Sequence, residues 1–109
     1  MMYYDFEAGN KAYKLRLNTR NLVELEKRIG CNPLSIFNEE DKLPTVSVMV
    51  AILHASLQQY QHSISLNDAY DIFDAYLETN TMTDFVWVIL EIYKASGLID
   101  NEVKTDEKN

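Results

Sequence analysis

The sequence predicts a mainly helical α+β fold, with an N-terminal β-hairpin packed on a small bundle of about four helices. Glycine and proline are scarce, with three and two residues in a chain of 109, which disfavours an all-β or loop-rich fold. Apolar residues recur at helical spacing after residue 18, whereas strict alternation is confined to the start of the chain. The length fits one domain, predicted over residues 1–98, followed by a disordered acidic tail over residues 99–109.

Two short runs at the N-terminus predict the hairpin. Residues 3–8 and 11–17 flank Gly9-Asn10, a pair of residues that favours a tight turn. The second run alternates apolar and mostly polar side chains, so one of its faces can pack on the helices. The first run has a thinner apolar face because two carboxylates interrupt it.

The first helix is predicted to end at Gly30, a residue typical of the position just after a helix. Its apolar positions recur three and four residues apart: Leu22, Leu25 and Ile29. Asn18 and Thr19 both suit the N-cap, and a capping box formed by Asn21 and Glu24 is the alternative.

Two further helices are predicted before residue 62. Asn32 followed by Pro33 predicts the start of a short helix over residues 33–38. Thr45 suits the N-cap of a longer helix that runs to about Gln61. This longer helix carries more apolar surface than one core contact needs, since Val48 and Ile52 lie off its main apolar face.

The last two predicted helices differ in character. The first, capped by Ser65 and ending near Thr79, is the most regular amphipathic helix of the chain, with an acidic outer face. The second is capped by Thr81 or Thr83 and ends at Gly97. Its central run, residues 85–90, leaves little polar face, so it is either central in the core or covered by a partner.

The net charge of −7 is unevenly distributed. Residues 1–30 carry a net charge of +2 and residues 31–109 carry −9, with no lysine or arginine between Lys42 and Lys94. Because binding to phosphates requires clustered cations, this distribution disfavours a nucleic-acid partner and allows a basic protein partner. The most apolar run, residues 46–57, is too short and too polar to cross a bilayer, so no membrane association is predicted.

No enzyme chemistry is predicted from the residues, and no catalytic, cofactor or metal site is assigned. Cys31 is the only cysteine, which suits a reducing compartment, and with His54 and His62 it lacks the number and spacing of ligands that zinc requires. No supporting triad surrounds Cys31, and the acidic helix lacks the glycine-containing twelve-residue loop of a calcium site. Glu24 and Glu26 point to different sides of a helix, so they do not form an acid–base pair.

Two groups of residues are candidates for binding a partner. The first is the surplus apolar surface of the two long helices: Val48, Ile52, Trp87 and Leu90. The alternative is that both sides of these helices are buried in the core. The second group is an acidic helix face that could meet a basic partner: Asp71, Asp74 and Glu78. The alternative for this group is an ordinary solvated helix face.

The stretch from Tyr13 to Gly30 and the turn after it resemble a known family. The shared elements are an alternating strand, a helix with a Leu-Glu pair, an Ile-Gly ending and a proline turn: Leu15-Arg16-Leu17, Leu25-Glu26, Ile29-Gly30 and Asn32-Pro33-Leu34. This pattern resembles the opening of the tail assembly chaperones of long-tailed bacteriophages and prophages. Later segments are similar to the family's further helices: residues 53–57, 68–70 and 92–98. The resemblance covers residues 13–98 as a pattern of apolar positions.

The resemblance implies a function without catalysis. Such chaperones are expected to bind the tape measure protein, a very long helical chain, and to keep it soluble until tail-tube subunits polymerise around it. The major tail tube protein is a further candidate partner. The expected location is the cytoplasm of the bacterial host, with no copy in the mature virion, and formation of a homo-oligomer is left open.

The alternatives to a chaperone function are a minor tail or head-tail component that stays in the virion, and a small acidic regulatory protein.

The chaperone family commonly makes a longer form by a −1 frameshift, and residues 107–109 can be encoded by a slippery run. Many other codons encode the same residues, so a solvated tail is the simpler interpretation.

Overall fold

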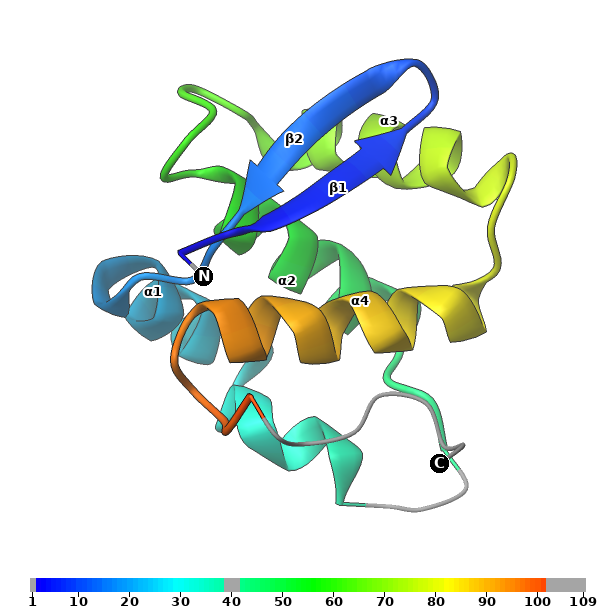
Figure 1. Cartoon of the computed structure of the whole chain (residues 1–109). Helices are drawn as coiled ribbons and strands as arrows, with labels where there is room; N and C mark the ends of the chain where they lie inside the picture. Colours follow the sequence, from blue (N-terminus) through cyan, green and yellow to red (C-terminus); the bar gives the residue numbers. More distant parts are fainter. Residues whose placement is uncertain (1, 39–41, 102–109) are drawn as a thin grey trace.

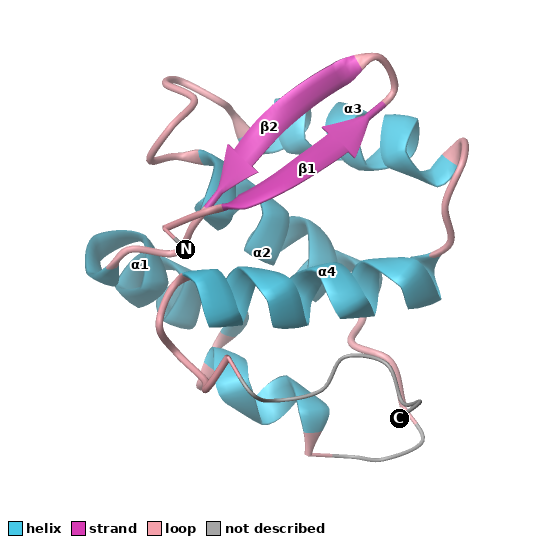
Figure 2. Cartoon of the chain, viewed as in Figure 1, coloured by secondary structure: helices cyan, strands magenta, loops and turns pink. Residues whose placement is uncertain are grey.

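The computed structural model describes residues 2–38 and 42–101 and has the predicted α+β architecture (Figures 1 and 2). An N-terminal hairpin precedes one 3₁₀ helix and four α-helices: β1 (Tyr4–Ala8), β2 (Lys11–Leu15), α1 (Thr19–Ile29), η1 (Pro33–Phe37), α2 (Val46–Leu57), α3 (Leu66–Leu77) and α4 (Met82–Ala95). The predicted tail falls mostly on residues 102–109, which lie outside the described residues. Within the described ranges, no helix is long and apolar enough to cross a membrane.

The hairpin is antiparallel, with Tyr4 paired to Leu15 and Phe6 paired to Tyr13. Gly9 in the connecting turn has a φ of 63°, a conformation that glycine adopts without steric cost. The thin apolar face predicted for the first strand is sufficient, because Phe6 and Ala8 are both buried while the carboxylates between and beside them point to solvent. This face packs on α3 and α4.

The side chain that caps α1 is Asn18, whose Oδ1 accepts a hydrogen bond from the Asn21 amide at 2.8 Å. The alternative cap at Thr19 and the capping box of Asn21 and Glu24 are therefore not used. The helix ends at Gly30, with a φ of 78°, as predicted. The predicted short helix is the 3₁₀ helix η1, which begins at Pro33.

Helix α2 ends at Leu57, about one turn earlier than predicted. The reason is that Gln61 bonds to the edge of the hairpin: its Oε1 accepts from the Lys14 amide at 2.7 Å, and its Nε2 donates to the Lys14 carbonyl at 2.9 Å. A glutamine side chain thus takes the place of a neighbouring strand, while the Gln61 amide donates to the Leu57 carbonyl at 3.0 Å. Both later helices begin with a capping box, formed by Ser65 with Asp68 and by Thr81 with Asp84.

Helix α2 is the centre of the fold, since α1, α3, α4 and β2 all pack against it. Figure 1 shows α1 and α3 on either side of α2, with α4 crossing in front of it. Aromatic rings from the hairpin, α3 and α4 pack in one cluster: Phe6, Phe73, Tyr76 and Phe85. The Tyr93 hydroxyl donates to the Pro33 carbonyl at 2.8 Å and ties α4 to η1. Four elements therefore pack on α2, and its accessible surface lies between them.

Candidate partner-binding surface

Ile52, predicted as part of a partner-binding surface, is a core residue. Its side chain is 0% exposed, at the centre of a helix that packs against three other helices and a strand. The prediction of an accessible Ile52 is therefore wrong. The physical reason is that a helix that is apolar all round gives no sign, in its sequence, of which side the other elements leave open.

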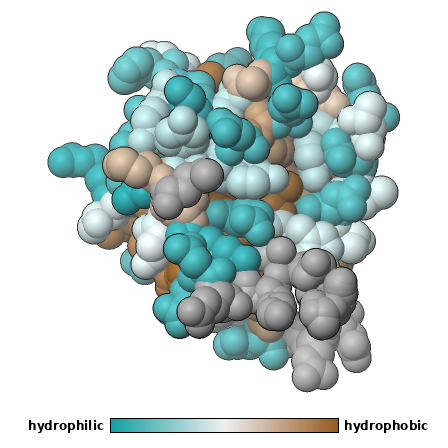
Figure 3. Space-filling view, in the orientation of Figure 1, coloured by the Kyte–Doolittle hydropathy of each residue, from teal (hydrophilic) through white to brown (hydrophobic). Residues whose placement is uncertain are grey.

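Trp87 and Leu90 lie on the outer side of α4, where Trp87 is 42% exposed and Leu90 is half-buried. Glu91 and Lys94 follow on the same helix and form an ion pair with an N–O distance of 3.6 Å. In Figure 3, which views the molecule from the α4 side, the described residues show hydrophobic areas that are small and separated by hydrophilic ones. Trp87 and Leu90 are accessible, and their role in binding a partner stays a prediction.

Val48 does not share a groove with those two residues. It borders a hollow of about 240 Å³ lined also by Ile29, Leu66 and Tyr70, and a second of about 460 Å³ beside Leu43. Neither hollow takes a side chain from α4. The predicted apolar set is therefore divided between the core, the α4 surface and a separate surface formed by α1, α2 and α3.

The acidic candidates are all exposed on α3, as predicted from its amphipathic pattern. Asp71 lines a hollow beneath the hairpin turn, together with Lys11. Asp74 lies one turn after Tyr70, and Glu78 caps the C-terminal end of the helix. None of the three carboxylates forms an ion pair within residues 2–38 and 42–101. Their binding to a basic partner stays a prediction.

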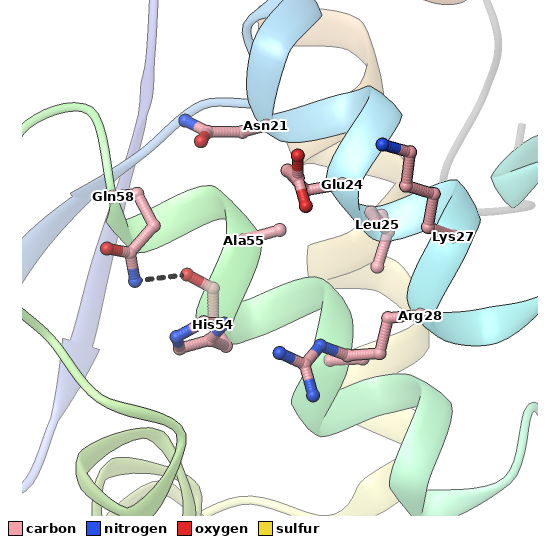
Figure 4. Close-up of a pocket in the computed structure, with 9 residues that line it drawn as sticks. Asn21, Glu24, Leu25, Lys27, Arg28, His54, Ala55 and Gln58 are labelled. Carbon is pink, nitrogen blue, oxygen red and sulfur yellow. Dashed lines mark hydrogen bonds between the residues drawn. The ribbon is translucent and has the colours of Figure 1, made fainter.

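A further hollow, between α1 and α2, has a volume of about 440 Å³ and was not predicted from the sequence (Figure 4). Its floor is apolar and buried, formed by Leu25, Ala51 and Ala55. Its walls are polar or charged: Asn21, Glu24, Lys27 and Arg28 from α1, and His54 and Gln58 from α2. The hollow exists because the two alanines leave room where larger side chains would fill the space between the helices.

The imidazole of His54 sits on the wall of this hollow, and Figure 4 shows Arg28 and His54 reaching toward each other across α2. Burial, and secondarily the neighbouring Arg28 guanidinium, lower the pKa of His54 below its usual value. The Gln58 amide donates to the carbonyls of His54 and Ile64, each at 2.9 Å, which fixes the end of the wall. Because His54 favours its neutral form, the positive charge of this hollow belongs to Lys27 and Arg28.

The three hollows that border α2 share lining residues, and we call them together the α2 groove. Arg28 and Ala51 line both the large hollow and the one beside Tyr70, and Val48 lines both that hollow and the one beside Leu43. The α2 residues that line the groove lie about one turn apart along the helix: Val48, Ala51, Ala55 and Gln58. From Val48 to Gln58 the groove extends for ~15 Å along the helix axis. Helix α4 runs behind α2 in Figure 4, so the groove opens away from α4.

The α2 groove combines an apolar floor with polar and charged walls, an arrangement that suits the binding of side chains. No group of three His, Cys, Asp or Glu side chains in the described ranges is arranged to hold a metal ion. Cys31, at the Leu43 end of the groove, is a free and exposed thiol. A sequence signal for the groove was present in the two alanines, which are four residues apart in a helix of mostly bulky side chains. Which elements would flank them was not evident before the helices were placed.

Residues 5–109 match DUF6096, described as a family of unknown function. The chain belongs to the DUF6096 family. No curated protein and no solved structure matches it. Because the match begins in β1 and runs through α4, the hairpin, the helices and the α2 groove all lie within the region that defines this DUF6096 protein.

Proposed function

We propose that this chain is a tail assembly chaperone that binds the tape measure protein of a long-tailed phage or prophage and keeps it soluble before the tail tube forms. The resemblance of residues 13–98 to such chaperones suggests this function. The observation that carries it is the α2 groove, because a long helical partner needs a surface that covers an apolar helical stripe.

The groove is an accessible surface beside a core that is buried without the help of a partner. The floor residues Leu25 and Ala51 are buried within the domain itself, while Val48, Ile29 and Tyr70 keep part of their apolar surface toward the groove. No buried side-chain polar atom in the described part of the chain lacks a hydrogen-bond partner. The domain thus satisfies its own interior and retains apolar surface in the groove, a combination that suits reversible binding.

The charge of the chain supports the same function. A net charge of −7 on 109 residues opposes association between copies at neutral pH. A complex of several such chains along one apolar helix would carry this charge on its outside. The charge would keep the loaded partner soluble until the tube subunits displace the chaperone.

Co-expression tests the proposal. The chain is expressed with the tape measure protein of the same gene cluster, and the soluble fraction of the tape measure protein is measured with and without it. We expect a several-fold rise in soluble tape measure protein and co-purification of the two chains. An unchanged soluble fraction would contradict the chaperone function.

The composition of purified virions distinguishes a chaperone from a structural component of the tail. Mass spectrometry of purified virions should detect the tail tube and tape measure proteins without stoichiometric amounts of this chain. Stoichiometric presence in the virion would favour a minor tail or head-tail component instead.

A further inference from the structure

We propose that the outer edge of β1 binds an extended segment of a partner protein, which adds to the hairpin as a further strand and carries basic residues opposite Asp5 and Glu7. This edge is separate from the α2 groove, whose lining residues include none from the hairpin. The inference does not depend on the proposed function. It adds a site for an extended basic segment to a domain already proposed to bind a helix.

The hydrogen bonds of Lys14 show which backbone groups of the hairpin face outward. Its amide and its carbonyl bond to the Gln61 side chain at 2.7 and 2.9 Å, so both point away from β1. Asp5 lies directly opposite Lys14, and opposite residues of an antiparallel pair point their backbone groups either toward each other or both outward. The backbone groups of Asp5, and of Glu7 two residues further along, therefore face away from β2.

The two edges of the hairpin differ in what covers them. On the β2 edge, the Gln61 side chain occupies Lys14, which leaves Ala12 as the one outward residue of β2 without a bond to the described residues. On the β1 edge, the outward groups of Asp5 and Glu7 bond to no other described residue. The described residues form a sheet of two strands, and Figure 2 shows β2 along one side of β1 only. The β1 edge therefore offers the longer run of open donors and acceptors to an incoming strand.

The charge of the β1 edge favours a basic strand. Both of its outward residues are acidic and exposed, and neither carboxylate forms an ion pair with another described residue. Lys94, beside the start of β1, pairs with Glu91 at 3.6 Å, and the Lys14 ammonium lies 5.0 Å from the centre of the Tyr3 ring. Residues directly opposite each other in a sheet have their Cβ atoms ~5 Å apart on one face, so a lysine or arginine opposite each carboxylate is attracted.

A second copy of the chain is disfavoured on this edge. Two β1 strands that pair antiparallel about Phe6 would place Asp5 of one copy opposite Glu7 of the other. Like charges directly opposite each other destabilise a sheet. The same two carboxylates therefore oppose self-association and favour a strand of opposite charge.

The direction of the open groups decides which residues of the incoming strand bond to β1. A residue opposite Asp5 or Glu7 exchanges N–H···O bonds with it in both directions, and its side chain lies on the same exposed face of the sheet. The basic residues of the segment are therefore the ones whose amides point toward β1. The residues between them point their amides away from β1 and their side chains toward the face that packs on α3 and α4.

Peptides with methylated backbone amides test this geometry on the full chain. The parent peptide alternates lysine and valine over about nine residues, enough to span β1. One derivative carries N-methyl groups on its central lysines, and the matched derivative carries them on the neighbouring valines. A third peptide replaces every lysine with glutamate. Affinity is measured by NMR titration of the ¹⁵N-labelled chain.

We expect the parent peptide and the peptide methylated on valine to bind with similar affinity, because the valine amides are not used. Methylation of the lysine amides should weaken binding at least about tenfold, since it removes hydrogen bonds and places methyl groups against the edge. The glutamate peptide should bind at least about tenfold more weakly than the parent, because it sets like charges opposite each other.

Hydrogen exchange of the chain's own amides locates the added strand. The bound parent peptide should slow exchange at the amides of Asp5 and Glu7, which have no hydrogen-bond partner among the described residues. Exchange at Phe6 should stay unchanged, because its amide already faces β2.

Proline variants distinguish the two edges of the hairpin. Glu7→Pro removes an amide from the β1 edge, and Ala12→Pro, directly opposite, removes one from the β2 edge; neither removes a bond between the strands. Glu7→Gln removes only the charge. We expect Glu7→Pro to weaken binding of the parent peptide most, Glu7→Gln to weaken it about two- to fivefold, and Ala12→Pro to leave it unchanged. The methylated peptides test the same bonds on the unaltered chain, so the test does not depend on the folding of either proline variant.

Each of the following results would overturn the inference. Equal affinity for the parent and the glutamate peptide would remove the requirement for basic residues. Equal weakening by both sets of N-methyl groups, or no binding of the parent peptide, would show that no strand adds to β1 in this way. Light scattering that finds a dimer, dissociated by Glu7→Pro, would assign the edge to a second copy of the chain.

Discussion

At the scale of single residues, burial divides side chains that look alike in the sequence. Ile52 and Trp87 are both apolar residues of long helices, yet Ile52 is 0% exposed and Trp87 is 42% exposed. The sequence placed both on one candidate surface because each helix has apolar residues on more than one side. Only the packing of four elements around α2 shows that Ile52 has no access to solvent.

Measurements of the free energy of unfolding test whether Ile52 is buried and Trp87 is exposed. Ile52→Ala should lower the free energy of unfolding by about 2–5 kcal/mol, because it leaves a cavity in a packed core. Trp87→Ala should lower it by less than about 1 kcal/mol, because much of the side chain already contacts water. Urea unfolding followed by circular dichroism gives both values, and equal losses for the two variants would refute the burial assignment.

The titration of His54 tests the electrostatics of the groove. Burial is the main cause of its lowered pKa and Arg28 is the second, so the folded pKa should lie below the usual value of 6.5. Arg28→Gln should raise this pKa part of the way, while Arg20→Gln, on the same helix but outside the groove, should leave it unchanged. NMR titration of the imidazole resonances measures the pKa of His54 in the unchanged chain and in both variants.

The lowered pKa of His54 makes the free energy of unfolding depend on pH. A histidine whose pKa is lower in the folded chain binds protons more readily when unfolded, so its contribution is complete above pH 6.5 and is lost as the pH falls through the folded value. Stability should therefore fall on acidification in this range, and His54→Gln should reduce that fall.

At the scale of elements, the sequence predicted which helices exist and which residues end them better than it predicted helix length. Gly30, Pro33, Ser65 and Thr81 occupy the positions predicted for them, because local hydrogen bonds and backbone conformation determine helix ends. The end of α2 was predicted one turn too late, because it depends on a long-range bond between Gln61 and Lys14. Local patterns carry no information about such a contact.

The cap of α1 gives a direct test at this scale. Asn18→Ala removes the bond to the Asn21 amide and a second bond, from Asn18 Nδ2 to Gln59 Oε1 at 3.1 Å, and should lower the free energy of unfolding by about 1 kcal/mol. Thr19→Ala, at the neighbouring position that also suited a cap, should change it by less than about 0.5 kcal/mol. The reverse order in thermal unfolding would show that Thr19 is the cap.

At the scale of the whole molecule, the candidate site is a product of how the helices are arranged. The sequence showed the basic end of α1 and the two alanines of α2, but not that they line one hollow. Helix α4 and the hairpin cover the opposite sides of α2 and close the core. The α2 groove lies on the surface of α2 that α4 and the hairpin leave uncovered, and it is where we expect the tape measure helix to bind.

The most direct test of this account maps the bound surface on the intact domain. Amide chemical shifts of the ¹⁵N-labelled chain are followed as a helical segment of the tape measure protein is added. We predict that the largest shifts fall on residues that line the α2 groove, above all Arg28, Val48, Ala51 and Tyr70, with little change around Trp87. Shifts centred on Trp87 and Leu90, or no shifts at saturating concentrations of the segment, would contradict the account.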